Sequence, residues 1–269
     1  HIDYYRRADM DVMKVMNDTG YGPIDSFRVT EPSDWADLEP TPLSEAHFQS
    51  HLEGLKGIVE ALGDEVLIMT TAFNPYHEAV MILKNSDPER YPTEHDARMA
   101  LLEQLRLERE PVLRAMGIMA ADLGRFYRAC VTEAGINGIY YSAQGGERAD
   151  MSDDEHAQFL RPYDMQVMNE IRPVAEFIVG HFCGQSLNLE RFAGYPIQLA
   201  NWAHQSDNPS LTQGRAIFGG ISILGGLDER GPLVYGPREA LEEEIEEAVA
   251  EMGTEGFMLG AGCTVPSDV

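Results

Sequence analysis

Positive charge is scarce in this chain of 269 residues. Asp and Glu number 45 against 20 Lys and Arg, which gives a formal net charge of −25. The lysines are Lys14, Lys56 and Lys84, so nearly all basic residues are arginines. Nucleic-acid binding requires a basic surface that neutralises phosphates, and anionic membranes repel a surface of this sign. The sequence therefore predicts neither a nucleic-acid partner nor a membrane partner.

Cysteines and long apolar runs are also scarce. No run of about 18 apolar residues occurs, so no segment has the composition of a membrane-spanning helix. Three cysteines are too few for a disulfide framework, and the expected location is a reducing cytoplasm. No signal-peptide pattern opens the chain, which begins at His1 and is expected to be a fragment. A hydrophobic content of 43% is enough for a packed core.

Short apolar runs alternate with helical stretches along the chain. Helical periodicity is present in residues 44–62, 96–135 (broken around Pro111), 155–170 and 237–252. The segments expected to be strands are 11–16, 65–70, 138–142, 175–180, 196–200, 216–219 and 256–260. This alternation, without a composition break, predicts parallel βαβ units in a single domain over residues 1–269. The expected fold is an α/β (β/α)8 TIM-type barrel that lacks its first strand.

One histidine and two cysteines lie at predicted strand ends. His181 and Cys183 follow the strand that ends at 180, and Cys263 follows the strand that ends at 260. Side chains two residues apart on an extended segment share one side, and the carboxyl ends of parallel strands share one barrel mouth. One imidazole and two thiolates suit Zn²⁺ with a fourth position open to substrate. Structural burial is an equally weighted alternative on spacing alone, and it is the expectation for Cys130.

A zinc site makes specific geometric demands on these residues. The nitrogen and two sulfur atoms should lie within roughly 4 Å of one another, because tetrahedral geometry at normal bond lengths allows little more. The other imidazole nitrogen should meet a carboxylate, carbonyl or water that fixes the tautomer. A separation of more than about 8 Å between Cys183 and Cys263 would exclude a shared ion.

Several segments resemble the uroporphyrinogen decarboxylase superfamily. The most specific are His-Phe-Cys-Gly at 181–184, Gly-Gly-Leu-Asp-Glu at 225–229 and the glycine-rich stretch 256–266 that contains Cys263. Residues 63–66, 71–75 and 138–146 extend the likeness over nearly the whole chain. The resemblance implies a TIM-type barrel. It also leads us to expect that the family's N-terminal helix and first strand, and a helix after Val269, lie outside this chain.

The superfamily has two branches that differ in metal use. Its decarboxylases are metal-free, whereas its cobamide-dependent methyltransferases carry a His-x-Cys…Cys zinc site that His181, Cys183 and Cys263 match one for one. The resemblance to the second branch implies a zinc-dependent methyltransferase. Such an enzyme moves a methyl group between a corrinoid (methylcobamide) protein and a thiol or similar acceptor such as coenzyme M or tetrahydrofolate. Zn²⁺, a partner protein that carries the corrinoid, and a small-molecule methyl donor or acceptor are therefore implied, with the direction of transfer left open.

Two alternative functions remain at this point. A uroporphyrinogen decarboxylase-like carboxy-lyase in tetrapyrrole metabolism would need arginines for a polycarboxylate substrate, and its branch has an Arg-Gln-Ala-Gly-Arg signature that this sequence lacks. A non-catalytic barrel scaffold would simply bury the cluster.

Other polar residues near strand ends are candidates for substrate binding. Two of them have further interpretations. His204 is alternatively a spare ligand or an exposed loop residue, and Asp228 is alternatively a helix cap. The candidates are Tyr141, Gln144, His204, Asp228 and Asn74. No catalytic residue is expected beyond the metal ligands.

Overall fold

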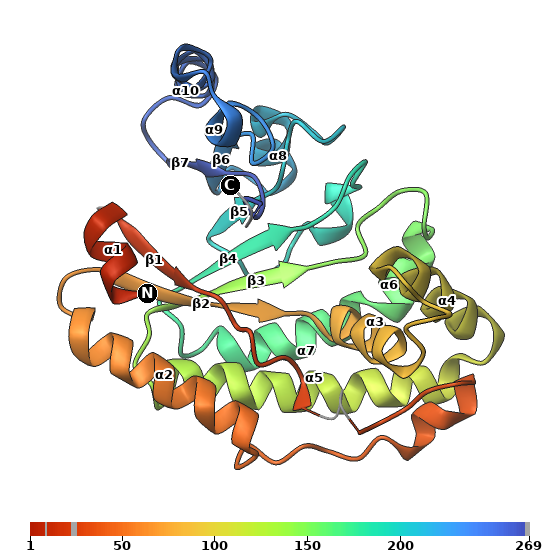
Figure 1. The fold of residues 1–269 in the computed structure, drawn as a ribbon. Coiled ribbons are helices and arrows are strands. Elements are labelled where there is room, and N and C mark those ends of the chain that lie inside the picture. The colour runs from red at the N-terminus through yellow and green to blue at the C-terminus, as the bar shows by residue number, and fades with distance from the viewer. Residues whose placement is uncertain (9, 23–25, 267–269) are drawn as a thin grey trace. The chain divides into compact units, whose positions relative to one another are not determined.

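The computed structural model describes residues 1–8, 10–22 and 26–266, and its elements are mixed α and β. The strands of this part of the chain are hydrogen-bonded in chain order, from β1 to β7 (Figure 1). The pairs β1–β2, β4–β5, β5–β6 and β6–β7 are all parallel. The strands are β1 (Val12–Val15), β2 (Leu67–Phe73), β3 (Gly138–Ala143), β4 (Phe177–Phe182), β5 (Leu199–Asn201), β6 (Ser222–Leu227) and β7 (Phe257–Ala261). The α/β class with a parallel sheet is confirmed, and the eight-stranded barrel stays a prediction.

The chain divides into two compact units. Unit 1 comprises residues 1–141 and 157–177, and unit 2 comprises residues 142–156 and 178–269. Helix α6 (Asp153–Phe159) begins in unit 2 and ends in unit 1. No helix in the described ranges is both long enough and apolar enough to cross a bilayer.

Unit 1 is built on long amphipathic helices. Helix α5 packs against α7, α3 and the 3-10 helix η2, and Figure 1 shows α5 and α7 side by side. Its buried residues recur every three to four positions, so one face is apolar along its length. Phe126 of this face stacks on Phe48 of α2 at 4.4 Å between ring centroids. The helical elements of unit 1 are α1 (Ile2–Ala8), η2 (Pro32–Asp37), α2 (Ala46–Leu62), α3 (Pro75–Ser86), α4 (Glu94–Leu107), α5 (Arg109–Thr132) and α7 (Arg161–Ile171).

The expected division of residues 96–135 into two helices near Pro111 is confirmed, with the break at Glu108. Helix α4 ends before Glu108 and α5 begins at Arg109, so Pro111 lies in the first turn of α5. A proline is tolerated there because the first amides of a helix have no partner within the helix. Helix α3 was not expected, although Asn74 and Pro75 form a typical start. The Asn74 side chain accepts a hydrogen bond from the His77 amide.

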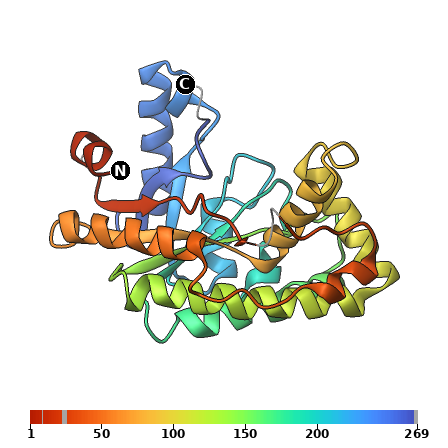
Figure 2. The same ribbon diagram turned by 60° about the horizontal axis from the view of Figure 1, so that its bottom comes forward.

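The helices of unit 2 pack against its last two strands, with α8 against β6. Helix α10 contacts β6 and β7, and Figure 2 shows it in blue. The acidic helix expected at 237–252 is therefore confirmed, with Ala248 and Met252 buried. The helical elements of unit 2 are η3 (Leu189–Phe192), α8 (Leu211–Ile217), α9 (Pro232–Tyr235) and α10 (Arg238–Met252).

The strand expected at residues 216–219 is wrong. Helix α8 ends at Ile217, and the sixth strand lies at residues 222–227. Ser210 and Gln213 form a reciprocal capping box that starts α8, a signal that outweighs the short apolar run at its end. Gly214 lets the helix approach closely, because a Cβ there would lie 2.2 Å from the Trp202 ring.

Candidate metal centre

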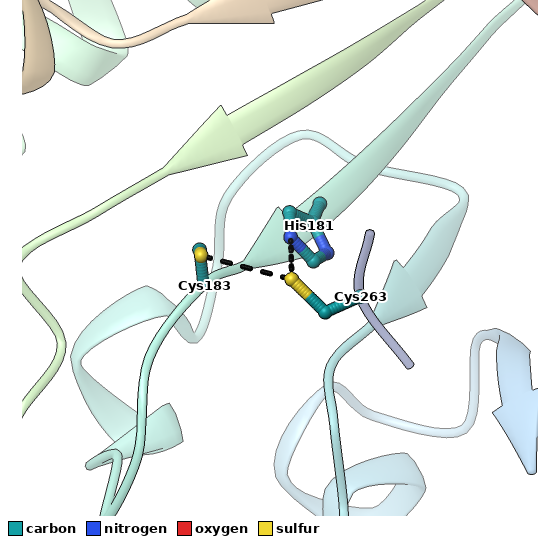
Figure 3. Close-up of side chains that lie close together, drawn as sticks. All are labelled: His181, Cys183 and Cys263. Carbon is teal, nitrogen blue, oxygen red and sulfur yellow. Dashed lines mark hydrogen bonds between the residues drawn. The ribbon is translucent and has the colours of Figure 1, made fainter. Parts of the chain in front are cut away.

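The side chains of His181, Cys183 and Cys263 converge in unit 2. Cys263 Sγ lies 3.9 Å from Cys183 Sγ and 3.6 Å from His181 Nε2 (Figure 3). All three ligand atoms lie within 4.8 Å of one another. The separation between the two sulfur atoms is far below the 8 Å that would exclude a shared ion. The sequence therefore located three residues that the fold does bring together, and their role as metal ligands stays a prediction.

Strand geometry explains why the three residues meet. His181 and Cys183 flank Phe182, whose ring faces the other side of β4 and stacks on Phe192 at 4.5 Å between centroids. Cys263 follows β7 by two residues. Gly262, which lies between the end of β7 and Cys263, donates its amide to Leu227 O at 3.0 Å. This bond extends the β6–β7 ladder toward the cysteine. The lack of a side chain at Gly262 is required, because a Cβ would lie 2.5 Å from Ala203 Cα.

Two of the three separations match those of a tetrahedral zinc site. Bonds of about 2.3 Å to sulfur and 2.0–2.1 Å to nitrogen at tetrahedral angles require about 3.8 Å between sulfurs and about 3.6 Å between sulfur and nitrogen. The observed values are 3.9 Å and 3.6 Å. Both cysteines are free thiols. The donor set and the two separations that involve Cys263 therefore fit Zn²⁺. The third pair, Cys183 Sγ and the His181 ring, lies within 4.8 Å, a wider limit than the roughly 4 Å expected from the sequence.

Asn201 orients the histidine for this role. Register pairs it with His181 across β4 and β5, and its Oδ1 lies 2.6 Å from His181 Nδ1. Its Nδ2 donates to Leu224 O at 2.8 Å and to Ala261 O at 3.1 Å. Both amide hydrogens are thus engaged, so Oδ1 must accept and His181 must carry its hydrogen on Nδ1. The lone pair of Nε2 then points toward the cysteines, as metal binding requires.

Sequence reasoning missed Asn201. It expected an unspecified carboxylate, carbonyl or water beside the imidazole, and the partner is an amide carbonyl. The available signal was an asparagine directly after the apolar strand expected at 196–200, and the structure shows this residue fully buried at the end of β5. Its use depends on the register between β4 and β5, which a single sequence does not provide.

The electrostatic environment favours a thiolate in the cluster. A hydrogen bond with Cys183, supported by His181, lowers the pKa of Cys263 to about 3, although burial opposes this change. Thiolates are the form that binds metals. Burial raises the pKa of the Cys130 thiol, which is enclosed within α5. The expectation that Cys130 is a buried structural residue is confirmed.

A small pocket opens beside the two cysteines of the cluster. Its volume is about 110 Å³. Glu229, two residues beyond β6, is buried, and burial raises the pKa of its carboxyl, with a further contribution from Cys263. Sequence reasoning placed Glu229 in a family motif without assigning it a role. Besides the cysteines, the lining consists of Phe182, Gly184, Gln185, Ala203, Ser206, Glu229 and Arg230.

Two of the other candidates lie near this pocket without lining it. Asp228 Oδ1 accepts the amide of Arg230 at 2.8 Å, and the Asp228 amide donates to Glu244 Oε1 at 2.9 Å. These contacts stabilise a turn. His204 is half-buried, and burial lowers its pKa against the opposing effect of carboxylates that include Glu251 and Glu244. Its ring is not part of the three-residue cluster, and substrate roles for both residues stay predictions.

The remaining candidates occupy other positions. Tyr141 is fully buried in unit 1, where its hydroxyl donates to Asp164 Oδ1 at 2.8 Å. Asn74, also in unit 1, caps α3. Gln144 follows β3 in unit 2, is half-buried and does not line the pocket. The contacts of Tyr141 and Asn74 are structural ones, and substrate binding by any of the three stays a prediction.

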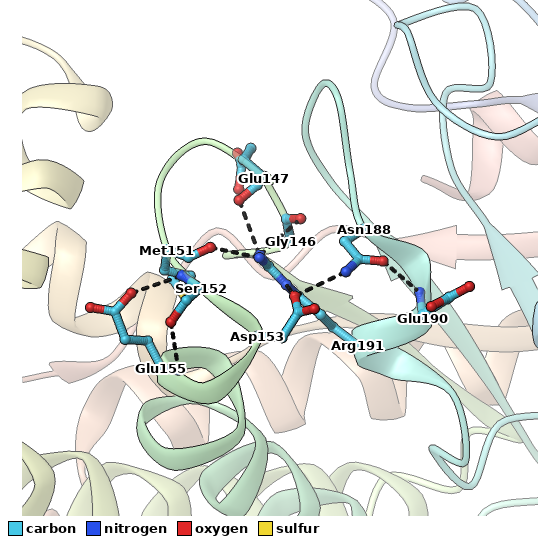
Figure 4. A network of polar contacts seen from close by, with 9 residues as sticks. All are labelled: Gly146, Glu147, Met151, Ser152, Asp153, Glu155, Asn188, Glu190 and Arg191. Carbon is cyan, nitrogen blue, oxygen red and sulfur yellow. Dashed lines mark hydrogen bonds and ion pairs between the residues drawn. The ribbon is translucent and has the colours of Figure 1, made fainter.

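A buried arginine holds the loop that follows β3. Arg191 forms an ion pair with Asp153 at 2.8 Å, and Asn188 binds the same carboxylate (Figure 4). The loop is held close to the segment after Cys183, since a Cβ at Gly184 would lie 2.8 Å from Glu147 Oε1. Arg191 thereby holds this loop next to Gly184, one of the residues that line the pocket. Its guanidinium also donates to the backbone carbonyls of Gly146, Glu147 and Met151.

Comparison with known proteins places this chain in a family. A structure of a methyltransferase from Methanosarcina mazei is similar with a TM-score of 0.70 and 17% identity, over 98% of this chain and 78% of that one. Endo-glycoceramidase II from Rhodococcus sp. is similar with a TM-score of 0.51 and 11% identity, over 97% of this chain and 66% of that one. At these identities the likeness shows the fold alone. No curated protein gave a significant match. The model of the uroporphyrinogen decarboxylase (URO-D) family matches residues 10–269, so the chain belongs to that family.

Proposed function

We propose that this family member is a zinc-dependent methyltransferase that moves a methyl group between a corrinoid protein and a small thiol or similar acceptor. Coenzyme M and tetrahydrofolate represent the acceptor classes. One observation carries the proposal: the ligand atoms of His181, Cys183 and Cys263 converge within 4.8 Å, and the two separations that involve Cys263 fit tetrahedral Zn²⁺. The similarity in fold to a methyltransferase supports it, as does the TIM-type barrel to which we assign the parallel sheet.

The residues of the chain have distinct parts in this chemistry. Zn²⁺ held by one imidazole and two thiolates supplies a Lewis acid that lowers the pKa of an acceptor thiol, so that a nucleophilic thiolate is present near neutral pH. Cys183 and Cys263 hold the metal as thiolates. Asn201 keeps the ring of His181 in the tautomer that binds metal through Nε2. The same ligand arrangement serves either direction of methyl transfer.

The pocket beside the cysteines receives the small-molecule partner. Its volume of about 110 Å³ admits the thiol end of a small acceptor and is far smaller than a tetrapyrrole. The corrinoid is therefore assigned to a separate partner protein that presents its methyl group at the edge of the sheet. The reducing cytoplasm is the compartment in which free thiols of this kind persist.

The decarboxylase alternative is less well supported. A polycarboxylate substrate calls for several arginines, and among the described residues that line the pocket only Arg230 is basic. The net charge of −25 adds a repulsive field. Neither a decarboxylase nor a scaffold accounts for an imidazole lone pair aimed at two thiols.

Metal analysis combined with a methyl-transfer assay tests the proposal. Protein purified under reducing conditions with zinc should contain about one Zn²⁺ per chain, as a single three-ligand site requires. Cys183→Ser and Cys263→Ser should lose the metal, whereas the control Cys130→Ala, which also removes one thiol, should retain it. The wild type should demethylate methylcobalamin in the presence of an acceptor from a panel of thiols and tetrahydrofolate. Equal zinc content in all variants, or no transfer to any acceptor, would contradict the proposal.

A further inference from the structure

The sulfur atoms of Cys183 and Cys263 lie close enough to react with each other. Cys183 follows β4 and Cys263 follows β7, with β5 and β6 between these two strands in the sheet. In a flat sheet three strand spacings would put about 14 Å between the strands, whereas the two Sγ atoms are 3.9 Å apart (Figure 3). The strands of unit 2 therefore bring two thiols together that are distant in the order of the sheet.

Only a small movement separates this pair from a disulfide bond. The sulfur atoms of a disulfide are about 2.05 Å apart, so the two Sγ atoms have to approach by about 1.9 Å. Both residues lie just beyond the regular part of their strands. Cys183 precedes a bend at Gly184, and Cys263 precedes the irregular residues 264–266. A change of side-chain rotamer and a small shift of these segments therefore close the bond.

The pocket gives an oxidant access to both thiols. Cys183 and Cys263 are half-buried and line the pocket of about 110 Å³. This volume holds several water molecules, and hydrogen peroxide is only slightly larger than water. Cys130, the third cysteine of the chain, is fully buried within α5. Oxidation of the folded protein therefore concerns Cys183 and Cys263.

We propose that Cys183 and Cys263 form a reversible disulfide under oxidising conditions, and that this bond prevents metal binding at the candidate centre. The inference rests on the proposed metal site. Thiolates bind metals, and a disulfide contains none, so oxidation removes two of the three ligands at once. Zinc in turn engages both thiolates and protects them from the oxidant. The metal-bound form and the disulfide form are therefore mutually exclusive states of one site, which makes the centre sensitive to redox conditions.

A peroxide is the oxidant for which the reaction is balanced. The sulfur of one cysteine attacks a peroxide oxygen, the O–O bond breaks, and a sulfenic acid and one water form. The second thiol attacks the sulfenic sulfur, which forms the S–S bond and releases a second water. The two thiols lose two electrons and two protons, and the peroxide takes up both. A small dithiol reverses the reaction by thiol–disulfide exchange and is itself oxidised.

Mass spectrometry of the full chain after peroxide treatment tests the inference. The metal-free wild type and the control Cys130→Ala should each lose about 2 Da, the mass of two hydrogens, and yield one peptide pair joined through Cys183 and Cys263. Cys183→Ser should form no internal disulfide. The urea midpoint of the oxidised wild type should rise, because the bond links residues 80 positions apart. Dithiothreitol should return the midpoint to its original value.

Zinc binding and oxidation should compete in the same protein. The oxidised wild type should bind no zinc, and dithiothreitol should restore about one Zn²⁺ per chain. At a free zinc concentration ten times the dissociation constant, the rate of disulfide formation should fall roughly tenfold, because only the metal-free fraction reacts. Cys130→Ala should show the same protection by zinc.

The outcomes that would overturn the inference are distinguishable from failure of the proposed function. Separate sulfinic acids on the two cysteines, or disulfides only between chains, would show that the pair does not close, while the metal site itself stands. Oxidised protein that retains its zinc would refute the exclusion of the metal by the disulfide. If the reduced protein binds no zinc, the proposed function fails, and the inference fails with it even where the disulfide forms.

Discussion

Asn201 connects the candidate metal centre to the sheet. Two replacements of this residue distinguish its effect on stability from its effect on zinc affinity. The side chain accepts one hydrogen bond from His181 and donates two to the carbonyls of Leu224 and Ala261. Asn201→Ala removes all three bonds. Asn201→Asp retains an acceptor for the imidazole but loses both donors and places a carboxylate against two carbonyl oxygens. The two variants therefore differ mainly in whether the histidine keeps its partner.

The structure sets the size of each effect. A hydrogen bond in a protein contributes about 1 kcal/mol, so Asn201→Ala should lower the free energy of unfolding by about 3 kcal/mol. Loss of the group that orients a metal-binding histidine typically weakens metal affinity by about 10–100-fold. Asn201→Asp should lose a similar amount of stability, because of the two unpaired carbonyls. Its zinc affinity should stay near that of the wild type, since a carboxylate also orients an imidazole.

Urea unfolding of the metal-free protein and chelator competition for zinc measure the two quantities separately. Asn137→Ala is a suitable control, because Asn137 lies in unit 1 and also bonds through its side chain, to the Ile68 amide and to Glu176. It should lower stability without changing zinc affinity. A zinc affinity of Asn201→Ala within twofold of the wild type would refute the argument that Asn201 orients His181.

Three further predictions concern thiols, packing and pH. A thiol reagent should modify two cysteines in the native metal-free protein, none in the zinc-loaded protein and all three after denaturation, because Cys130 is fully buried. Gly214→Ala should lower the unfolding free energy by about 1–3 kcal/mol, because its Cβ would overlap the Trp202 ring. Gly57→Ala should instead raise the unfolding free energy by about 0.5–1 kcal/mol, measured by thermal or urea unfolding. Gly57 lies in the middle of α2, and no atom lies within 4 Å of the added Cβ. Burial raises the pKa of Glu78 to about 7, so its stabilising contribution is complete below about pH 4.5 and is lost as the pH rises through 7. Glu78→Gln should therefore be more stable than the wild type at pH 8 by up to about 3 kcal/mol, with little difference at pH 4.5; equal unfolding free energies at pH 8 would contradict this.

The convergence of His181, Cys183 and Cys263 could be predicted from the sequence because their positions follow from local rules. Alternation along a strand places His181 and Cys183 on one side, and the parallel order of the strands places Cys263 at the same edge. These rules need only strand identity and direction. Asn201 and Glu229 depend on register and on the course of a turn, which are set by packing between distant segments. Those two residues were consequently missed or left without a role.

The sequence predicted element boundaries wrongly where two short patterns favour different structures. The run from Ala216 to Phe218 is apolar enough for a strand, yet it forms the end of a helix that the capping box of Ser210 and Gln213 starts. The break between α4 and α5 occurs at Glu108, three residues before the proline that was expected to cause it. In α8 a hydrogen-bonded cap favours the helix, whereas no side chain caps the start of α5 at Glu108.

The architecture of unit 2 indicates that the fold itself assembles the three side chains of the candidate metal centre, before any metal binds. The two cysteines are 80 residues apart in sequence, so in an unfolded chain their approach would carry a large entropic cost. In the folded chain β5 and β6 lie between the strands that carry them, and Asn201 bonds to residues of β4, β6 and β7. Folding of the sheet has therefore already brought the two cysteines together, so metal binding does not carry this entropic cost. Metal binding should stabilise unit 2 by mass action without being required for its folding, in contrast to small zinc domains whose ligands are assembled only by the ion.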